Sequence, residues 1–201
     1  MLFGDLEGSS LELRAGQDGR RVIRGRFPYN SLATLSDGGR NGGRPRKEQF
    51  APGAFSHSIE NADQDIALLS GHDFSRPLAS KKTGSLLFTD SAEALTFDAT
   101  IVPEVAATSY AQDLFGLIAA GLSIGLSPGF RIPPPSAVPP DRAEKIEEEN
   151  PSLGRALIRT ILQAILFEMS IVTRPAYADA QVEARNWSID HPPRRKRILL
   201  P

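Results

Sequence analysis

Two serines four residues apart stand out in a segment of glycines and apolar residues at positions 121–130. These are Ser123 and Ser127. The glycines around them let another backbone approach closely, and the apolar neighbours predict a buried strand. A serine on a rigid strand, with open space before its hydroxyl, is the setting that a nucleophile for acyl transfer needs. The alternative interpretation is a glycine-bounded turn whose serines hydrogen-bond their own backbone.

A histidine in the first half of the chain is the second candidate for chemistry. His72 follows a short apolar run at residues 65–70, which predicts a buried strand. A histidine at the end of such a strand can face a cleft while its backbone is held rigidly. It can also be a structural residue at a strand terminus, and the local sequence favours that interpretation. His57 lies off the apolar face of its segment and is predicted to be at the surface.

A carboxylate in the most apolar part of the chain is the third candidate. Glu168 lies within residues 165–172, where the β-branched residues favour a strand over a helix. On a strand, Glu168, Ser170 and Val172 share one face. A buried carboxylate must be paired, because its desolvation otherwise costs several kcal/mol. The alternative is a glutamate on an edge strand that faces water.

Composition excludes several classes of protein. The chain has 201 residues, 40% of them hydrophobic, with a net charge of -1, no cysteine and 3 histidines. This near-neutral balance argues against a general nucleic-acid binder, and the absence of cysteine excludes disulfides, thiol catalysis and cysteine zinc sites. No apolar run approaches the roughly 20 residues of a membrane span, and no signal peptide is evident after Met1. Phosphate-loop and dinucleotide fingerprints are also absent.

The elements expected to position the three candidates are mainly strands. Alternating or β-branched patterns predict strands at residues 11–15, 21–30, 65–70, 84–88, 95–101 and 161–173. Short helices are expected after the Pro52–Gly53 turn, at residues 177–185, and from Ser109, where Ser109 and Gln112 form a capping box. That last helix should end at Gly121 and lead straight into the serine segment.

Two segments have too little apolar surface to order themselves, and we expect them to be mobile loops. They lie near residues 36–47, which are rich in glycine, and near residues 131–152, where prolines precede a run of charges. The chain is then predicted to be one domain over residues 1–190, followed by a basic tail at 191–201.

Four segments together resemble a known family. They are FAPGAF at 50–55, LLSGHD at 68–73, GLSPGF at 125–130 and FEMSIVTRPA at 167–176. Each is short, but all four occur in the family's order, spread across roughly residues 20 to 182. The chain resembles the prohead (capsid maturation) proteases of tailed phages, which are serine proteases related to the herpesvirus assemblins.

The resemblance implies a catalytic histidine at His72 and a nucleophilic serine in a Gly-Leu-Ser-x-Gly-Phe segment. Ser127 matches this pattern fully, whereas Ser123 is followed by Leu126 where the pattern has phenylalanine. The departure at Pro128 matters chemically, because proline has no backbone N–H to donate. The oxyanion hole of such an enzyme must therefore draw its donors from elsewhere.

Glu168 is the candidate for the group that orients His72. Its place in the Phe-Glu-x-Ser segment resembles the assemblin position where a second histidine does this. In acyl transfer, His72 would take the proton from Ser127 and return it to the leaving amine. Asp73 is the rival of Glu168, but adjacent residues on a strand point to opposite faces.

By resemblance, the fold is mainly β (α+β): an antiparallel β-barrel with flanking helices, similar to the herpesvirus proteases. The implied function is a serine endopeptidase that cleaves scaffold and capsid precursor proteins during phage prohead maturation, and also cleaves itself. The implied partners are the major capsid protein precursor and scaffold segments as substrates, and possible further copies of the chain. No membrane, specific nucleic acid, cofactor or metal is expected, and the implied location is the host bacterial cytoplasm, inside the assembling prohead.

Two other functions are compatible with these residues. The first is a catalytically inactive capsid-assembly factor on the same fold, which would need neither His72 nor Ser127. The second is a different serine hydrolase, such as an esterase. The second has less support, since the Gly-x-Ser-x-Gly at 125–129 precedes a proline-rich segment rather than the helix of a nucleophile elbow.

Overall fold

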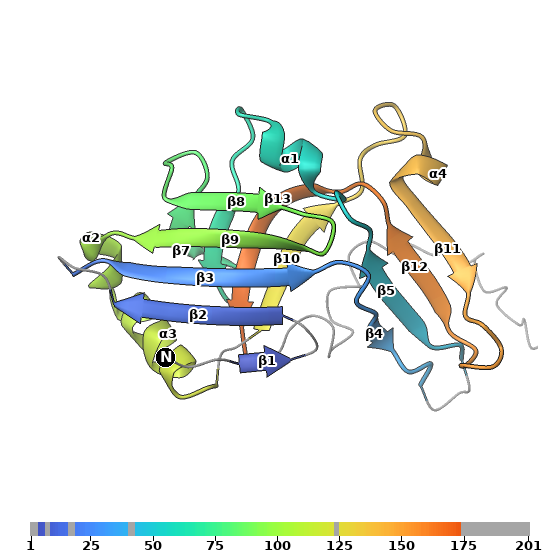
Figure 1. Ribbon diagram of the computed structural model, residues 1–201, viewed down its shortest axis with the longest axis horizontal. Helices are drawn as coiled ribbons and strands as arrows, with labels where there is room; N and C mark the ends of the chain where they lie inside the picture. Colours follow the sequence, from blue (N-terminus) through green and yellow to red (C-terminus); the bar gives the residue numbers. More distant parts are fainter. Residues whose placement is uncertain (1–3, 7–8, 16–18, 40–42, 123–124, 174–201) are drawn as a thin grey trace, which may run out of the picture.

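The computed structural model describes residues 4–6, 9–15, 19–39, 43–122 and 125–173 (Figure 1). This part of the chain is mainly β with a few short helices, and its strands form three open sheets. The five-stranded sheet has the order β1 (Gly4–Leu6), β2 (Ser9–Ala15), β3 (Arg21–Pro28), β9 (Ala94–Ile101) and β8 (Leu86–Asp90). All its neighbouring strands are antiparallel.

A four-stranded sheet lies behind the five-stranded sheet in Figure 1 and carries the candidate residues. Its order is β10 (Gly125–Arg131), β13 (Ile165–Val172), β6 (Ala67–Ser70) and β7 (Asp73–Ser80). The two sheets contact each other at Gly25 in β3. A Cβ atom at Gly25 would lie 2.3 Å from the Phe97 ring and 2.9 Å from Cδ1 of Leu126, so only glycine fits there.

The hydrophobic core lies between these two sheets. Strands of the five-stranded sheet contribute fully buried Ile23, Leu95 and Ile101, and the second sheet contributes Leu68, Leu126, Leu166 and Met169. The β10–β13 pair has a register shift between Gly129 and Phe130, and beyond it Met169 and Ile171 of β13 and Leu126 of β10 point into the core, so the side chains that alternate with them point away from it. That outward face contains the candidate serine and glutamate.

A third sheet forms the right-hand part of Figure 1, in the order β11 (Glu144–Glu148), β12 (Leu157–Ile161), β5 (Arg46–Phe50) and β4 (Ala33–Ser36). β11 lies within one of the two segments predicted as loops, and β4 and β5 border the other. The prediction of a loop at 131–152 is wrong for residues 140–148, where α4 (Pro140–Ala143) and β11 lie, whereas residues 132–139 form neither helix nor strand. Ion pairs of Arg44 with Glu148 and of Lys47 with Glu149 join the two segments. The mobility of either segment stays a prediction.

The predicted antiparallel barrel is also corrected. No closed barrel is present among the described residues, and two strand pairs are parallel: β12 with β5, and β13 with β6. The parallel pairs have a simple cause in the path of the chain. It passes from the third sheet into the second twice, from β5 to β6 and from β12 to β13, and the two passages run side by side in the same direction.

The helices are short and connect the sheets. α1 (Ser56–Glu60) follows β5, and α2 (Pro103–Ala106) and α3 (Ser109–Ala119) follow β9. The predicted capping box is wrong, because Thr108 is the N-cap of α3 and no side chain caps the helix there. Gly121 ends this helix as predicted, with φ +69° and its N–H donated to the carbonyl of Ile118. No helix in the described residues is long and apolar enough to cross a membrane.

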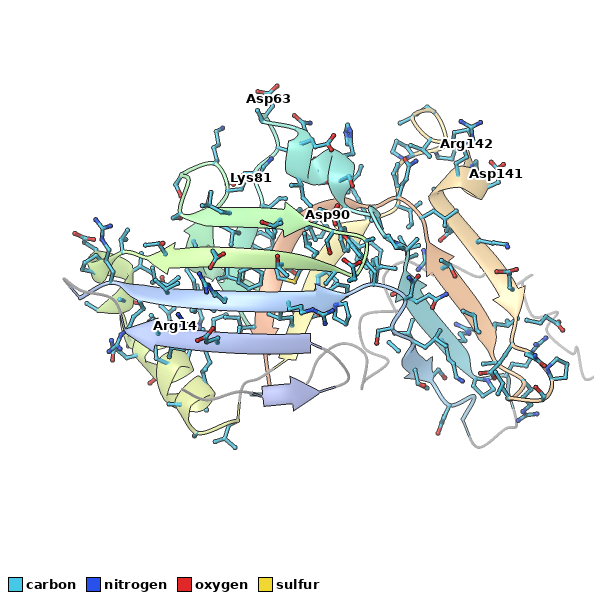
Figure 2. The ribbon with its side chains drawn as sticks, in the orientation of Figure 1. Arg14, Asp63, Lys81, Asp90, Asp141 and Arg142 are labelled. Carbon is cyan, nitrogen blue, oxygen red and sulfur yellow. The ribbon has the colours of Figure 1, made fainter. Side chains whose placement is uncertain are left out.

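A partly buried lysine fixes the connection that leads into β6. The ammonium group of Lys81, labelled in Figure 2, donates hydrogen bonds to the carbonyls of Ser58, Asn61 and Gln64. These carbonyls lie at the end of α1 and in the turn after it, where helix carbonyls lack intrahelical partners. The lysine therefore anchors the start of the hairpin whose far end carries His72.

Candidate active site

His72 occupies the turn of the β6–β7 hairpin. Ser70 pairs with Asp73 across this turn, so Gly71 and His72 are its two central residues. Both have positive φ, +68° and +62°, as a type I′ hairpin turn requires. Histidine is uncommon in this conformation, which costs on the order of 1–3 kcal/mol and persists only where neighbours hold it. Here the N–H of Gly71 donates to Ile171 O (3.0 Å), and that of His72 donates to Ser170 Oγ (2.9 Å).

Glu168 lies in the interior of its sheet, and its side chain is only 3% exposed. Strand β13 lies between β10 and β6, so the alternative of an edge-strand glutamate facing water is wrong. One carboxylate oxygen, Oε1, lies 2.6 Å from Nδ1 of His72, and the other, Oε2, accepts a hydrogen bond from Ser170 Oγ at 2.7 Å. These two contacts supply the pairing that a buried carboxylate needs.

Gly129 provides the space for this carboxylate. Gly129 in β10 is the direct cross-strand partner of Glu168. A Cβ atom at Gly129 would lie 2.1 Å from Oε1 of Glu168 and 2.6 Å from its Cδ and Cγ atoms. Any side chain at this position would displace the carboxylate from His72. The glycine is therefore part of the site, although it contributes no functional group.

Ser127 lies on the same face, two residues before Gly129 and directly opposite Ser170. It is 1% exposed, and its Oγ is the one buried side-chain polar atom without a hydrogen-bond partner among the described residues. No hydrogen bond joins it to His72 in this conformation. An unsatisfied buried hydroxyl is rare in proteins and calls for an explanation, because it costs about 1–3 kcal/mol.

The structure thus brings His72, Ser127 and Glu168 to one face of one sheet. Ser127 and Ser170 are direct cross-strand partners, so their side chains point to the same face. Glu168 lies two residues before Ser170 on the same strand and therefore shares that face. His72 comes from a hairpin turn that folds back onto that face, and its side chain remains 37% exposed. The arrangement offers a hydroxyl, an imidazole and a carboxylate, which are the groups of a serine hydrolase.

The other candidates lie elsewhere. Asp73 does not contact His72: its carboxylate accepts hydrogen bonds from Ser75 and pairs with Arg76. The hydrogen bonds from Ser75 hold the pKa of Asp73 below its ordinary value. His57 is exposed on α1, as predicted. Ser123, the helix expected at 177–185 and the basic tail at 191–201 lie outside the described residues.

Two residues of the site were missed from the sequence. Ser170 hydrogen-bonds both the backbone of His72 and the carboxylate of Glu168. Its position two residues after Glu168 on a strand was the available signal, since it placed both on one face. For Gly129, the sequence carried no signal of its close approach to a carboxylate.

Comparison with known proteins agrees with the resemblance noted above. Residues 9–195 match the family described as Caudovirus prohead serine protease. No curated protein and no solved structure matches the chain. The family match covers most of the sequence and confirms two predictions, the tailed-phage prohead protease family and the activity of a serine protease. The chain therefore belongs to the family of Caudovirus prohead serine proteases.

Proposed function

We propose that this protein is a capsid maturation endopeptidase in which Ser127 is the nucleophile, His72 the general acid–base and Glu168 the group that orients His72. Its substrates are scaffold protein, the scaffold-like arm of the capsid precursor, and the protease itself. The observation that carries the proposal is the contact between Nδ1 of His72 and buried Glu168. The same face holds Ser127, whose Oγ is the only buried side-chain polar atom without a hydrogen-bond partner among the described residues.

The chemistry follows from which atoms are occupied. The hydrogen bond of Nδ1–H to Glu168 selects the tautomer whose other nitrogen, Nε2, accepts a proton. Nε2 then takes the hydroxyl proton of Ser127 as Oγ bonds to the substrate carbonyl carbon, forming a tetrahedral intermediate. His72 next gives this proton to the leaving amine as the peptide C–N bond breaks. Water releases the acyl group from Ser127 by the same two proton transfers in reverse.

Two features of β10 bear on this mechanism. Pro128 follows the nucleophile and lies in an edge strand, which is where a sheet tolerates proline. Since Pro128 has no N–H, the donors for the oxyanion come from other residues. Ser127 is also covered in this conformation, so the groups around its Oγ must separate before a substrate carbonyl can reach it.

The covered hydroxyl is also the observation that favours the second candidate, an inactive capsid-assembly factor. On that alternative, His72 and Glu168 are a structural pair and Ser127 never meets a substrate. The finer predictions belong to the first proposal: the relation to the herpesvirus protease fold, self-association, and the location inside the assembling prohead.

Incubating the purified full chain with its capsid precursor separates the two functions. We expect cleavage by the wild-type protein and none by Ser127→Ala, while Ser123→Ala reduces the rate only modestly. Loss of a triad serine removes several orders of magnitude in rate, so gel analysis and intact-mass measurement suffice. Cleavage by Ser127→Ala together with an inactive Ser123→Ala would reverse the assignment of the nucleophile. If the wild-type chain does not cleave the capsid precursor in any form tested, the assembly-factor alternative is favoured.

A further inference from the structure

The hydroxyl of Ser170 joins His72 and Glu168, the two residues proposed to act with Ser127. It accepts the N–H of His72 at 2.9 Å and donates to Oε2 of Glu168 at 2.7 Å. Ser170 is fully buried and lies directly opposite Ser127 across the β10–β13 pair. From this we infer that Ser170 is a positioning residue that sets the geometry of the His72–Glu168 pair, an inference that rests on the proposed function.

The first effect of Ser170 is on the backbone of His72. The left-handed conformation of His72 is unfavourable for a residue with a side chain, and the turn that contains it leads the chain into β7, on the side of β6 away from β13. The hydrogen bond from the His72 N–H is the contact that ties this turn to Oγ of Ser170. Without the hydroxyl, the N–H loses its partner and the imidazole loses one of the restraints on its place.

The second effect is on the carboxylate of Glu168. The terminal torsion of a glutamate is soft, so the carboxylate plane has no strong preference of its own. Ser170 holds Oε2 and thereby turns Oε1 toward Nδ1 of His72. Groups that orient a functional side chain in this way contribute strongly to activity without touching the substrate.

The third effect concerns Ser127. A serine hydroxyl has a single hydrogen, and Ser170 gives its hydrogen to Glu168. Ser170 therefore has no proton to donate to Ser127 across the strand pair. No hydrogen bond from Ser170 therefore occupies the lone pairs of the proposed nucleophile.

Ser170→Ala tests the inference, with Ser58→Ala as the matched control. Ser58 is also a fully buried serine whose hydroxyl binds the segment leading into β13: it accepts the N–H of Leu166 at 3.0 Å and donates to Ala164 O at 3.5 Å. It makes no hydrogen bond to His72 or Glu168. Both variants remove one buried hydroxyl next to one strand, so only an effect on the site distinguishes them.

In precursor cleavage, we expect Ser170→Ala to lower kcat about 10- to 100-fold with KM nearly unchanged, the range seen when a supporting group is lost. Ser58→Ala should keep kcat within about twofold, since it leaves the site's hydrogen bonds intact. Ser170→Thr keeps the hydroxyl and should recover part of the loss. If Ser170→Ala does not fold, Ser170→Cys gives the same test, because its thiol is of similar size and a poor hydrogen-bond partner. An unchanged kcat in the Ala or Cys variant, or an equal loss in Ser58→Ala, overturns the inference.

A second measurement does not depend on catalysis. Nitrogen-15 NMR of His72 reports which ring nitrogen carries the proton. We expect the wild-type chain and Ser58→Ala to show one tautomer, protonated at Nδ1, and Ser170→Ala to show a mixture of tautomers. The same single tautomer in all three proteins would show that Ser170 does not position the pair. If the wild-type chain cleaves nothing but Ser170→Ala still shows the mixture of tautomers, the proposed function is refuted and the positioning role stands.

Discussion

Replacing Ser127 by alanine should stabilise the fold while it removes activity. The Oγ of Ser127 is buried without a hydrogen-bond partner, a state that costs about 1–3 kcal/mol. Alanine removes this penalty and leaves only the small space of one oxygen atom. The net effect should be a gain of about 1 kcal/mol in the free energy of unfolding. In a chain of this size, such a gain raises Tm by about 2–4 °C.

Ser170→Ala is the contrasting change in the same strand pair. Its hydroxyl makes two hydrogen bonds, so the alanine variant leaves the N–H of His72 and one oxygen of Glu168 without a partner. We expect a loss of about 1–3 kcal/mol, the opposite sign to Ser127→Ala. Two serines that face each other across one strand pair should therefore respond in opposite directions.

Urea denaturation of both variants and the wild type measures this difference, and cleavage of the capsid precursor on the same samples measures activity. Equal m-values would show that the change lies in stability rather than in the compactness of either state. If Ser127→Ala is destabilised as much as Ser170→Ala, the Ser127 hydroxyl has a partner in solution. In that case, the interpretation of Ser127 as a nucleophile whose hydroxyl has no hydrogen-bond partner is wrong.

Three further changes test other parts of the structure. Glu168→Gln should fold normally and lose about 10 to 10⁴ in rate, less than Ser127→Ala does, and a wild-type rate would make Glu168 a structural residue. Gly129→Ala should abolish most of the activity and destabilise the fold, because its Cβ would lie 2.1 Å from Oε1 of Glu168; wild-type cleavage would contradict this. Burial, and after it the hydrogen bond to Asp90, raises the pKa of Tyr29 above its ordinary value of 10.0. The tyrosine therefore ionises in the unfolded chain at a lower pH than in the folded one. Its contribution to the free energy of unfolding should be fully present below pH 10 and fall above it. Thermal melts from pH 8 to 11 would show a smaller fall in Tyr29→Phe, and equal slopes would refute the assignment to Tyr29.

The local sequence determined most of the strands and the face on which the candidate residues lie. Period-2 alternation placed β9, and β-branched residues placed β13, both of which the structure confirms. The same alternation put Glu168 and Ser170 on one face, because the pleat of a strand is a local property. Gly121 as the end of α3 was equally predictable, since a left-handed residue after a helix favours glycine.

The third sheet and the open arrangement depended on tertiary contacts. Residues 144–148 are poor in apolar side chains, yet they form β11 because β12 lies beside them and Arg44 pairs with Glu148, 104 residues away. The parallel pairing of β13 with β6 likewise follows from two passages of the chain that are distant in sequence. Local propensity carries no information about such partners, so the charged run at 144–148 was mistaken for a loop.

The geometry of the site was decided by the tertiary structure as well. The histidine, the serine and the glutamate were identified from the sequence. The alternation of side chains along each strand puts Ser127 and Glu168 on one face only because β10 and β13 pair in this register. The left-handed turn at His72, the space over Gly129 and the unpaired hydroxyl of Ser127 each require β13 to lie between β10 and the β6–β7 hairpin. A hydrogen bond across 96 residues, from His72 to Glu168, exists only after these strands have assembled.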